Sequence, residues 1–410
     1  MDKLKQTFFE LCRILTGIIF LFSGFAKAVD TIGGAIKIED YIVAWGFELP
    51  SAVYTALSLL LNTAEFMTGF MLLFKLYVPL ASLAALLFMV CFTPLTLYIA
   101  IANPVSDCGC FGDAVKLSNW GTFAKNMVIL PIAIMLFVNR RSLQGRMNAW
   151  RTACMTGGGL LAVLLTEAEG LTNEPIIDFR PYAVGTDIRK AMEIPADAEQ
   201  PEYETKFVMR KDGVEKTFDV NDYPYNDSTW VYVDTKTTII REGYTPPIKD
   251  FTFTDRNSEP ATEHLLGSES PIMMAIAPSV AGIDTAMAAE LRRVSEVCLN
   301  SGIEFYVATS SSAAEVAELE NRASSGFDVL WADETMLKTI VRSYPGFVLM
   351  QGGVVVGKYS AGTLPYDSDL ATPLATSLRQ QRLTAERAVV IVGALALMIL
   401  FLSIYKKHKR

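Results

Sequence analysis

The segment LYVPLASLAALLFMVCFTPLTLYIAIA, residues Leu76–Ala102, contains no charged side chain. A membrane-spanning helix needs about 20 mostly apolar residues, because each residue advances the helix by about 1.5 Å through about 30 Å of hydrocarbon. Five further runs are mostly apolar, and we expect each of them to be a transmembrane helix: Ile14–Val29, Ala52–Phe74, Gly121–Val138, Ala153–Thr166 and Ala388–Tyr405. The sequence therefore predicts an α-helical membrane bundle.

The first of these runs also has features of a secretory signal peptide. Lys3 and Lys5 resemble a basic amino-terminal region, and Ala26-Lys27-Ala28 resembles a cleavage site built from small residues. Glu10 and Arg13 interrupt that pattern, so we favour a membrane helix that is retained.

The charged residues divide the chain into two parts. The whole chain has 36 Lys+Arg and 44 Asp+Glu, a formal charge of −8. Residues 168–386 have 19 basic and 34 acidic side chains, a net charge of −15, whereas the remainder has 17 and 10, a net charge of +7. This division is typical of a membrane protein with one water-soluble acidic domain. An acidic domain without a basic stripe argues against nucleic acid as a partner.

Basic residues also predict the orientation of the bundle, because cytoplasmic loops are enriched in Lys and Arg. Lys75, Arg140-Arg141 and the tail Lys406–Arg410 fall on the same side when the chain crosses the membrane six times. We therefore expect a multi-pass protein of the bacterial cytoplasmic (inner) membrane with both termini in the cytoplasm. The loops at 30–51 and 104–120 and the acidic block are then periplasmic.

The acidic block begins with signals for β-structure. Two alternating runs, Tyr203–Arg210 and Val214–Val220, flank Lys211-Asp212-Gly213. Asp-Gly between two such runs predicts a hairpin. Trp230–Val233 and Thr237–Arg241 predict a second hairpin in the same segment.

From residue 250 onward, predicted strands and helices alternate. The order is βαβαβαββ, which implies a central sheet flanked by helices, with its last two strands antiparallel. The predicted strands are 271–277, 304–308, 329–331, 346–350 and 354–359, and the predicted helices are 284–300, 313–324 and 334–342.

This order and a few local residues resemble a thioredoxin-like domain. Those residues are Asp250-Phe251-Thr252 at the start, Tyr344-Pro345 where that fold keeps a cis-proline, and Phe347-Val348-Leu349 before Gly352-Gly353-Val354. Thioredoxins place Cys-x-x-Cys at the start of the helix after the first long strand, where the helix lowers a thiol pKa. Here that position reads Pro278-Ser279-Val280-Ala281-Gly282. The departure favours binding or scaffolding over disulfide exchange for this domain.

Two of the six cysteines lie in a polar loop, Ser106-Asp107-Cys108-Gly109-Cys110-Phe111-Gly112-Asp113, on the side of the membrane where disulfides persist. A disulfide needs Cα atoms within about 7 Å, and a chain bent at Gly109 meets that limit with strain. Strain makes the bond labile, and closing so short a loop adds little stability. We therefore predict that Cys108 and Cys110 are a redox pair that exchanges disulfides with an extracytoplasmic partner protein.

Two other interpretations of the pair stay open. Cys108 and Cys110 can form a static disulfide, or half of a metal site in which Asp107 and Asp113 are the nearby ligands. The chain has only two histidines, so a His-rich metal site is excluded and we predict no metal. The other four cysteines are interpreted as small apolar packing residues: Cys12, Cys91, Cys154 and Cys298.

A longer motif surrounds this loop in the first third of the chain. It reads Arg13-x-x-x-Gly17-x-x-Phe20-x-x-Ser23-Gly24-x-x-Lys27-x-x-Asp30, then Glu65-x-x-x-Gly69, then Asp107-Cys108-Gly109-Cys110-Phe111-Gly112 with Trp120 and Asn126. Over residues 8–140 this resembles the DoxX/MauE family of four-helix, redox-associated membrane proteins. The resemblance implies thiol or quinone oxidation, and for MauE a role in methylamine metabolism through disulfide formation in a partner enzyme.

Three charged residues within the predicted spans need an explanation. Glu65 lies mid-span, where a charge is costly and should face the bundle interior. It is either a proton or quinone-site carboxylate, or the structural partner of a neighbouring polar group. We expect Lys27 to extend toward the outer interface and Arg13 to anchor the inner one. No cofactor-binding motif is evident, and a quinone is the electron carrier that the resemblance implies.

These observations predict an organisation and two classes of function. The domains are a four-helix membrane domain at 1–142, a fifth transmembrane helix at 150–168, a β-rich segment at 170–247, a thioredoxin-like domain at 248–375 and a carboxyl-terminal helix at 387–405. One function is that of a membrane thiol–disulfide oxidoreductase, and the other is that of a non-catalytic, membrane-anchored binding or scaffold protein. A transporter is disfavoured, because no repeat of broken helices is evident.

Overall fold

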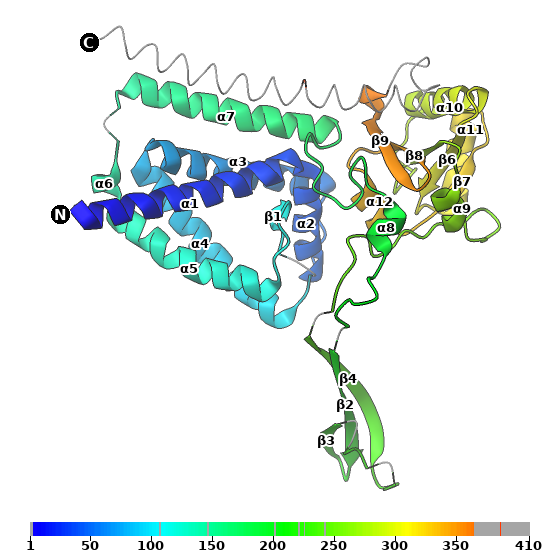
Figure 1. Ribbon diagram of the computed structural model, residues 1–410, viewed down its shortest axis with the longest axis horizontal. Helices are drawn as coiled ribbons and strands as arrows, with labels where there is room; N and C mark the ends of the chain where they lie inside the picture. Colours follow the sequence, from blue (N-terminus) through cyan, green and yellow to red (C-terminus); the bar gives the residue numbers. More distant parts are fainter. Residues whose placement is uncertain are drawn as a thin grey trace. The chain divides into compact units, whose positions relative to one another are not determined.

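The computed structural model describes residues 3–105, 108–145, 147–200, 202–219, 222–224, 226–241, 243–364 and 386. The chain forms two compact units, one made of Met1–Thr186 with Thr252–Arg410 and the other of Asp187–Phe251. The larger unit contains a helical bundle and an α/β domain (Figure 1).

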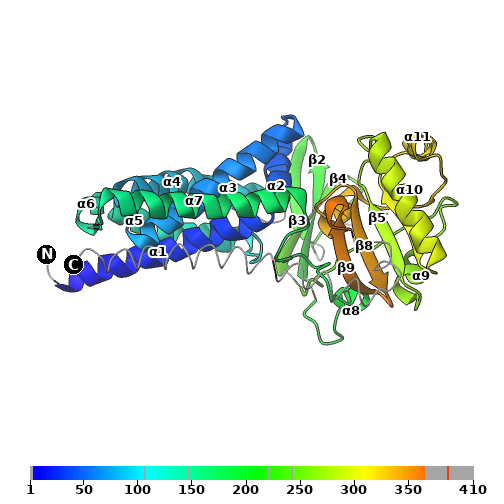
Figure 2. The ribbon, with the colours of Figure 1, turned by 90° about the horizontal axis from the view of Figure 1, so that it is seen from above.

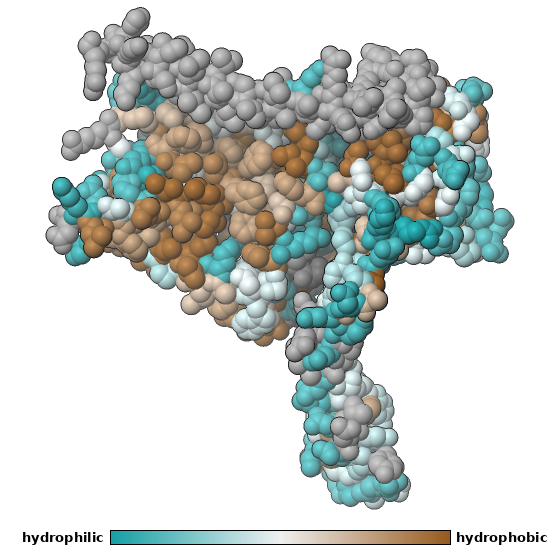
Figure 3. Space-filling view, viewed as in Figure 1, coloured by the Kyte–Doolittle hydropathy of each residue, from teal (hydrophilic) through white to brown (hydrophobic). Residues whose placement is uncertain are grey.

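Four helices within the described ranges are long and apolar enough to cross a membrane: α1 (Lys3–Val29), α3 (Ser51–Phe74), α4 (Val78–Ala102) and α5 (Asn119–Val138). They run alongside one another in Figure 2, and hydrophobic residues cover much of the bundle face seen in Figure 3. The carboxyl ends of all four helices coincide with those predicted from the sequence, so these four apolar helices are confirmed.

Helices α1 and α3 approach closely because glycines lie in their interface. A Cβ atom on Gly24 would lie 2.3 Å from the backbone nitrogen of Phe66, and one on Gly69 would lie 2.1 Å from that of Leu21. Glycines of this kind let membrane helices pack with their backbones in contact. The close approach brings polar side chains of α1 next to those of α3.

The predicted fifth span is part of a longer helix, α7 (Ala149–Thr172). It packs closely on α3, since a Cβ atom on Gly159 would lie 2.7 Å from the ring of Phe70. The helix is confirmed, whereas its crossing of the membrane stays a prediction. The predicted sixth span, Ala388–Tyr405, lies outside the described residues.

The loop predicted at residues 30–51 contains a helix, α2 (Thr31–Ala44). The Asp30 carboxylate caps it by accepting a hydrogen bond from the Gly33 backbone N–H at 2.9 Å. Gly33 and Gly34 lower the helix propensity of its first turn, which hides the helix from a reading of the sequence. A second short helix, α6 (Arg140–Leu143), follows α5.

The α/β domain is built on a five-stranded sheet of order β7-β6-β5-β8-β9. Strands β5, β6 and β7 are parallel, whereas β8 is antiparallel to β5 and β9 is antiparallel to β8. The strands are β5 (Ile272–Ile276), β6 (Glu304–Thr309), β7 (Asp328–Trp331), β8 (Gly346–Gln351) and β9 (Val354–Ser360). The helical elements are α9 (Thr262–Gly267), α10 (Thr285–Asn300), α11 (Ala313–Ala323), α12 (Glu334–Ile340) and the 3₁₀ turn η1 (Ala361–Thr363).

Local signals in the sequence explain why these elements form. Asp284, Ser312 and Asp333 each accept a backbone hydrogen bond at the first turn of α10, α11 and α12. Strand β5 is buried along its whole length, as its apolar sequence requires. The Tyr344-Pro345 peptide bond is cis. The predicted element order and the thioredoxin-like fold are therefore confirmed.

The segment that follows α7 belongs to the α/β domain. The Gly185 N–H donates to the carbonyl of Val355 at 2.8 Å, and the Val355 N–H donates to the carbonyl of Thr186 at 2.9 Å. The first described strand after α7 is β2 (Glu202–Lys211), within the segment 170–247 that was predicted to be rich in β-structure.

The smaller unit contains α8 (Ile188–Met192) and an antiparallel sheet of order β3-β2-β4. Strands β2 and β3 (Val214–Asp219) form the predicted hairpin, with Asp212 and Gly213 at φ angles of 50° and 80° in its turn. The predicted second hairpin is wrong, because β4 (Val231–Arg241) is a single strand paired along β2. Local polarity at residues 234–236 suggests a turn, but pairing with a distant strand outweighs it.

Candidate functional site

Cys108 and Cys110 lie in the loop between α4 and α5, and Cys110 begins the short strand β1 (Cys110–Asp113). Both thiols are free and half-buried, and their Sγ atoms are 3.1 Å apart. Gly109 has a φ of 63°, in the left-handed region that favours glycine. The bend predicted at this residue is present, and it turns the two thiols toward each other.

Side chains from two helices hold the carbonyl groups of the two cysteines. The Tyr41 hydroxyl of α2 donates a hydrogen bond to the carbonyl of Cys108 at 2.9 Å. The Ser23 hydroxyl of α1 donates to the carbonyl of Cys110 at 2.7 Å, and it also lies 2.8 Å from Oε2 of Glu65. The cysteine loop is thereby fixed to the bundle at both residues.

Glu65 lies beneath this loop with only 6% of its surface exposed. Its Oε2 atom is 2.5 Å from Nζ of Lys27. A buried carboxylate inside a membrane bundle is costly unless a cation and hydrogen bonds compensate it, and Lys27 and Ser23 do so here. Lys27 therefore pairs with Glu65 instead of extending to the interface as predicted, and Glu65 faces the bundle interior as predicted.

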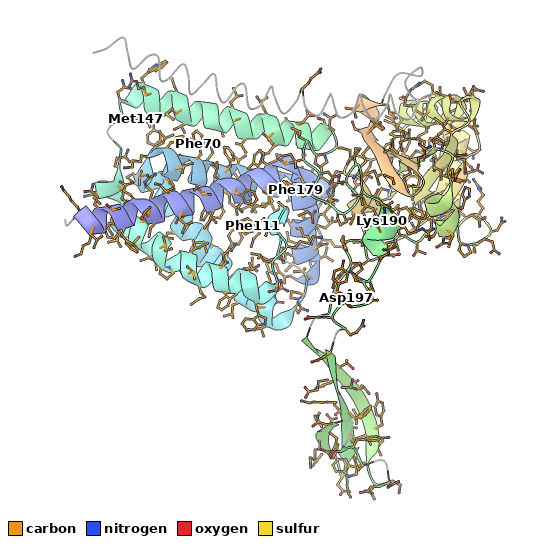
Figure 4. The ribbon with its side chains drawn as sticks, in the orientation of Figure 1. Phe70, Phe111, Met147, Phe179, Lys190 and Asp197 are labelled. Atoms are coloured by element: carbon orange, nitrogen blue, oxygen red, sulfur yellow. The ribbon has the colours of Figure 1, made fainter. Side chains whose placement is uncertain are left out.

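An aromatic ring on β1 packs between the cysteine loop and the bundle helices α1 and α5. Phe111, labelled in Figure 4, packs on Phe22 of α1 with ring centroids 5.8 Å apart. The Lys125 ammonium of α5 lies 4.5 Å from the centroid of the Phe111 ring, a cation–π arrangement. A second positive charge is therefore held close to the cysteines.

These surroundings give the two thiols different acidities. The two sulfurs share a hydrogen bond in which either can donate, and this contact with Cys108 lowers the pKa of Cys110 to about 6. Burial opposes the shift, while Lys125 and Lys27 assist it through their charges. The same hydrogen bond, with burial, raises the pKa of Cys108. Cys110 is therefore the sulfur that ionises first.

Arg13 lies near the other end of α1, away from the cysteine loop. Its guanidinium donates to the carbonyls of Leu72 and Leu73, the latter at 2.9 Å, and pairs with Glu10 at 2.9 Å. Carbonyls at the end of a helix lack partners within the helix, so a buried cation there is stabilising. Arg13 is buried and caps α3, while its predicted role as an anchor at the inner interface stays a prediction.

The remaining cysteines are separate from this site. Cys298 is fully buried in the core of the α/β domain, and Cys12 is buried in the bundle, as expected for apolar packing. Cys154 is half-buried, whereas Cys91 is exposed on α4. Among the described residues, no group of three or more His, Cys, Asp or Glu side chains has the arrangement of a metal site.

The thioredoxin-like domain has no cysteine where that fold places its reactive pair. The segment between β5 and α10 begins with Pro278, whose carbonyl accepts hydrogen bonds from the hydroxyls of Thr309 at 3.2 Å and Ser310 at 2.7 Å. The Val280 N–H donates to the Ser311 hydroxyl at 3.1 Å. These bonds give the segment structural contacts with the end of β6.

Arg342 of the thioredoxin-like domain reaches the end of the cysteine loop. Nε of Arg342 lies 2.9 Å from both carboxylate oxygens of Asp30, and its Nη2 lies 3.3 Å from Oδ2 of Asp113. Asp113 is the last residue of β1, and Asp30 is the cap of α2. An ion pair therefore joins the two domains beside the cysteines.

Several residues of this site were not identified from the sequence. Ser23 and Asp30 belong to the motif that defines the family resemblance, so a signal was present. Lys125 precedes Asn126 of the same motif, which is a weaker signal. Tyr41 and Arg342 carry no local signal, because their contacts come from segments far apart in the sequence.

The helical bundle and its cysteine loop match a known family. Residues 5–139 match the model of the family described as methylamine utilisation protein MauE. Residues 5–139 are a MauE domain. Residues 203–242, which contain most of the β3-β2-β4 sheet, match a domain of unknown function, DUF8463. No curated protein matches the chain.

Three solved structures align with about a third of the chain. They are a candidate protein disulfide isomerase from Bacteroides thetaiotaomicron (12% identity, 32% of this chain and 88% of that chain, TM-score 0.25), a peroxidoxin from Mycobacterium tuberculosis (13%, 32% and 91%, TM-score 0.25) and a secreted disulfide oxidoreductase from Mycobacterium tuberculosis homologous to Escherichia coli DsbE (15%, 30% and 94%, TM-score 0.23). The thioredoxin-like assignment rests on the strand order of the α/β domain.

Proposed function

We propose that the MauE domain exchanges thiols and disulfides with an extracytoplasmic partner protein through Cys108 and Cys110, in a bacterial cytoplasmic membrane. The observation that carries the proposal is the 3.1 Å contact between two free thiols, one of which has a pKa lowered to about 6. A thiolate is the nucleophile of disulfide exchange, and a neighbouring thiol is needed to resolve the mixed disulfide.

The exchange takes two steps when the pair starts as a dithiol. The Cys110 thiolate attacks one sulfur of the partner disulfide, so a Cys110–partner bond forms, the partner bond breaks and one partner thiolate leaves. That thiolate takes the proton of Cys108, and the Cys108 sulfur then attacks Cys110. The Cys108–Cys110 disulfide forms, the second partner thiolate leaves, and the partner has gained two electrons.

The same steps run in reverse when the pair starts as a disulfide and the partner is a dithiol. The electrons that the pair gains or loses must then be passed on two at a time. A membrane quinone is the class of carrier that suits this transfer, because it takes up two electrons and two protons.

Glu65 is proposed as the proton or quinone-site carboxylate of this transfer. The position of Glu65 supports this proposal. The carboxylate is buried between α1 and α3, paired with Lys27, and linked through Ser23 to the carbonyl of Cys110. The same ion pair is equally compatible with the alternative role, in which Glu65 only compensates the charge of Lys27.

Labelling with a membrane-impermeant maleimide tests whether the pair cycles. The intact protein is labelled in spheroplasts before and after treatment with a membrane-impermeant reductant, and peptides are identified by mass spectrometry. We expect labelling of Cys108 and Cys110 only after reduction of the oxidised form. Labelling that does not respond to oxidants or reductants contradicts the proposal.

Trapping identifies which cysteine attacks. We expect Cys108→Ser to accumulate a mixed disulfide with a partner, because Cys110 remains while the resolving thiol is gone. Cys110→Ser is the matched control, and it should accumulate much less. An equal yield of adduct from both variants contradicts the assignment of Cys110 as the nucleophile.

The second candidate function is that of a membrane-anchored binding or scaffold protein. It is favoured by the thioredoxin-like domain, whose Pro278–Gly282 segment replaces the reactive cysteines with residues that make structural hydrogen bonds. Under this alternative, the double variant Cys108→Ser/Cys110→Ser keeps its partner, which crosslinking through lysine side chains measures. Loss of the partner in the double variant supports the redox function instead.

A further inference from the structure

Arg342 of the thioredoxin-like domain forms ion pairs beside the cysteine site. It is 8% exposed and lies just before the Tyr344-Pro345 turn that enters β8. Its guanidinium binds both oxygens of Asp30 at 2.9 Å and approaches Asp113 at 3.3 Å. One planar side chain therefore bridges two carboxylates of the bundle, as the several donors of a guanidinium allow.

The two carboxylates belong to the elements that hold the cysteines. Asp30 caps α2, and Tyr41 of the same helix donates to the carbonyl of Cys108. Asp113 ends β1, the strand that Cys110 begins. Arg342 therefore joins the element that fixes one cysteine to the element that contains the other.

Arg342 is itself fixed by the segment between α7 and the smaller unit. Oε1 of Glu174 accepts the backbone N–H groups of Arg342 at 2.8 Å and Ser343 at 3.0 Å. Oε2 of Glu174 pairs with Arg180 at 2.8 Å. Arg342 is thus held at both ends: Glu174 binds its backbone N–H, and Asp30 binds its guanidinium.

The charges around Arg342 are balanced in a buried environment. Burial alone would raise the pKa of Asp30, but the charges of Arg342 and Arg180 outweigh it and hold that pKa below its usual range. Removing Arg342 would leave Asp30 with less compensation, which is costly for a buried carboxylate. The ion pair is therefore a specific attachment and not an exposed surface contact of little strength.

We propose that Arg342 is a positioning residue for the Cys108–Cys110 pair, so that docking of the thioredoxin-like domain sets how readily the two sulfurs join. This inference rests on the proposed redox function. Its physical basis is the short Sγ–Sγ contact. Both the hydrogen bond between the sulfurs and the closing of the disulfide require a short distance between Cys108, which α2 holds, and Cys110, which begins β1. Loosening either element separates the sulfurs and weakens both effects.

The test compares Arg342→Gln with Arg342→Lys in the full-length protein in detergent. Two quantities are measured: the oxidised fraction of the pair in defined glutathione buffers, and the pH midpoint of Cys110 alkylation. We expect Arg342→Gln to change the dithiol–disulfide equilibrium constant by about threefold or more, as coupled groups in one network do, and to raise the alkylation midpoint. Arg342→Lys keeps the positive charge but lacks the planar guanidinium with its several donors, so its change in the equilibrium constant should be smaller than that of Arg342→Gln.

Two further variants make the result specific. Arg292→Gln is the control, because Arg292 pairs with Glu296 on an exposed face of α10 in the same domain. Asp113→Asn and the double variant Arg342→Gln/Asp113→Asn complete a double-mutant cycle. We expect the change in the dithiol–disulfide equilibrium in the double variant to be smaller than the sum of the changes in the two single variants. Thermal unfolding confirms that each variant is folded.

The outcomes separate this inference from the proposed function. A pair that cycles in wild type, with the equilibrium constant and pH midpoint of Arg342→Gln equal to those of Arg292→Gln, overturns the positioning role and leaves the redox function intact. A pair that stays in one oxidation state in every variant overturns the redox function itself.

Discussion

Cys110 differs from an ordinary cysteine because three groups favour its ionised form. Its sulfur shares a hydrogen bond with that of Cys108, and Lys125 and Lys27 contribute positive charge. A cysteine in water ionises near pH 8.5. The chemistry proposed for this site therefore depends on its neighbours as much as on the sulfur atom.

The pH profile of alkylation tests this account. For the reduced protein, we expect the rate at Cys110 to rise as pH increases through about 6 and to level off by neutral pH, because only the thiolate reacts. Cys108→Ala removes this hydrogen bond and should move the midpoint upward, toward the value of a free cysteine. Lys125→Gln should move it upward by less, whereas Lys116→Gln, in an exposed part of the same loop, should have little effect. A wild-type midpoint near 8.5 contradicts the account.

The buried pair of Lys27 and Glu65 makes a second residue-level prediction. Glu65→Gln leaves the Lys27 charge buried without its partner, and we expect a loss of about 3 kcal/mol in the free energy of unfolding. Glu65→Gln/Lys27→Met removes both charges, so it should be more stable than the single variant. Thermal unfolding in detergent, with wild type as reference, measures both, and a double variant less stable than the single one would contradict the prediction.

At the scale of elements, the glycines between α1 and α3 decide how the site is assembled. They bring Ser23 and Lys27 of one helix against Glu65 of the other. The motif described above has both glycines and polar residues on α1 and α3. The structure explains why the two kinds of residue occur together. Close backbone packing is the condition under which those polar side chains meet.

Gly24→Ala tests this packing. Its Cβ atom would lie 2.3 Å from a backbone nitrogen, so the helices must separate, and we expect a loss of about 1–3 kcal/mol in the free energy of unfolding. Gly157→Ala in α7 meets no neighbour within 4 Å and should be neutral or stabilising by up to about 1 kcal/mol. Equal effects of the two substitutions, measured by thermal unfolding in detergent, would refute the role of Gly24.

Much of the element order could be predicted from the sequence, because apolar runs and strand–helix alternation are local patterns. The spans end where the apolar runs end, and the caps of α10, α11 and α12 are short polar signals. Helix α2 and strand β4 were missed for opposite reasons. Glycines weaken the local signal of α2, and β4 is stabilised by pairing with β2, which local sequence does not reveal.

At the scale of the whole molecule, the direction of insertion determines which compartment the cysteines meet. Basic residues around Arg140-Arg141 predict that the end of α5 is cytoplasmic, so the α4–α5 loop is predicted to lie outside. We expect alkaline phosphatase fused after Leu117 to be active and the same enzyme fused after Ser142 to be inactive. Green fluorescent protein at the same two positions is the control and should give the opposite pattern. An active cytoplasmic reporter after Leu117 would contradict the predicted orientation.

The candidate site could be predicted only in part, because its members come from distant parts of the chain. The two cysteines and Glu65 were identifiable from their types and positions. The pairing of Arg342 with Asp30 joins residues 312 positions apart, and no periodicity or motif relates them. Ion pairs between domains depend on how the domains dock, which composition does not encode.

The Ser23 hydroxyl has one hydrogen and two acceptors, the Glu65 carboxylate and the carbonyl of Cys110. A single hydrogen satisfies one acceptor well at a time, so its orientation follows whichever oxygen attracts it more. If the pair cycles as proposed, we expect the making or breaking of the sulfur–sulfur bond to alter the charge beside that carbonyl and to rotate the hydroxyl. The carboxylate stretching bands of Glu65 in the infrared spectrum would then shift with the oxidation state, giving a vibrational signal of electron transfer without any added label.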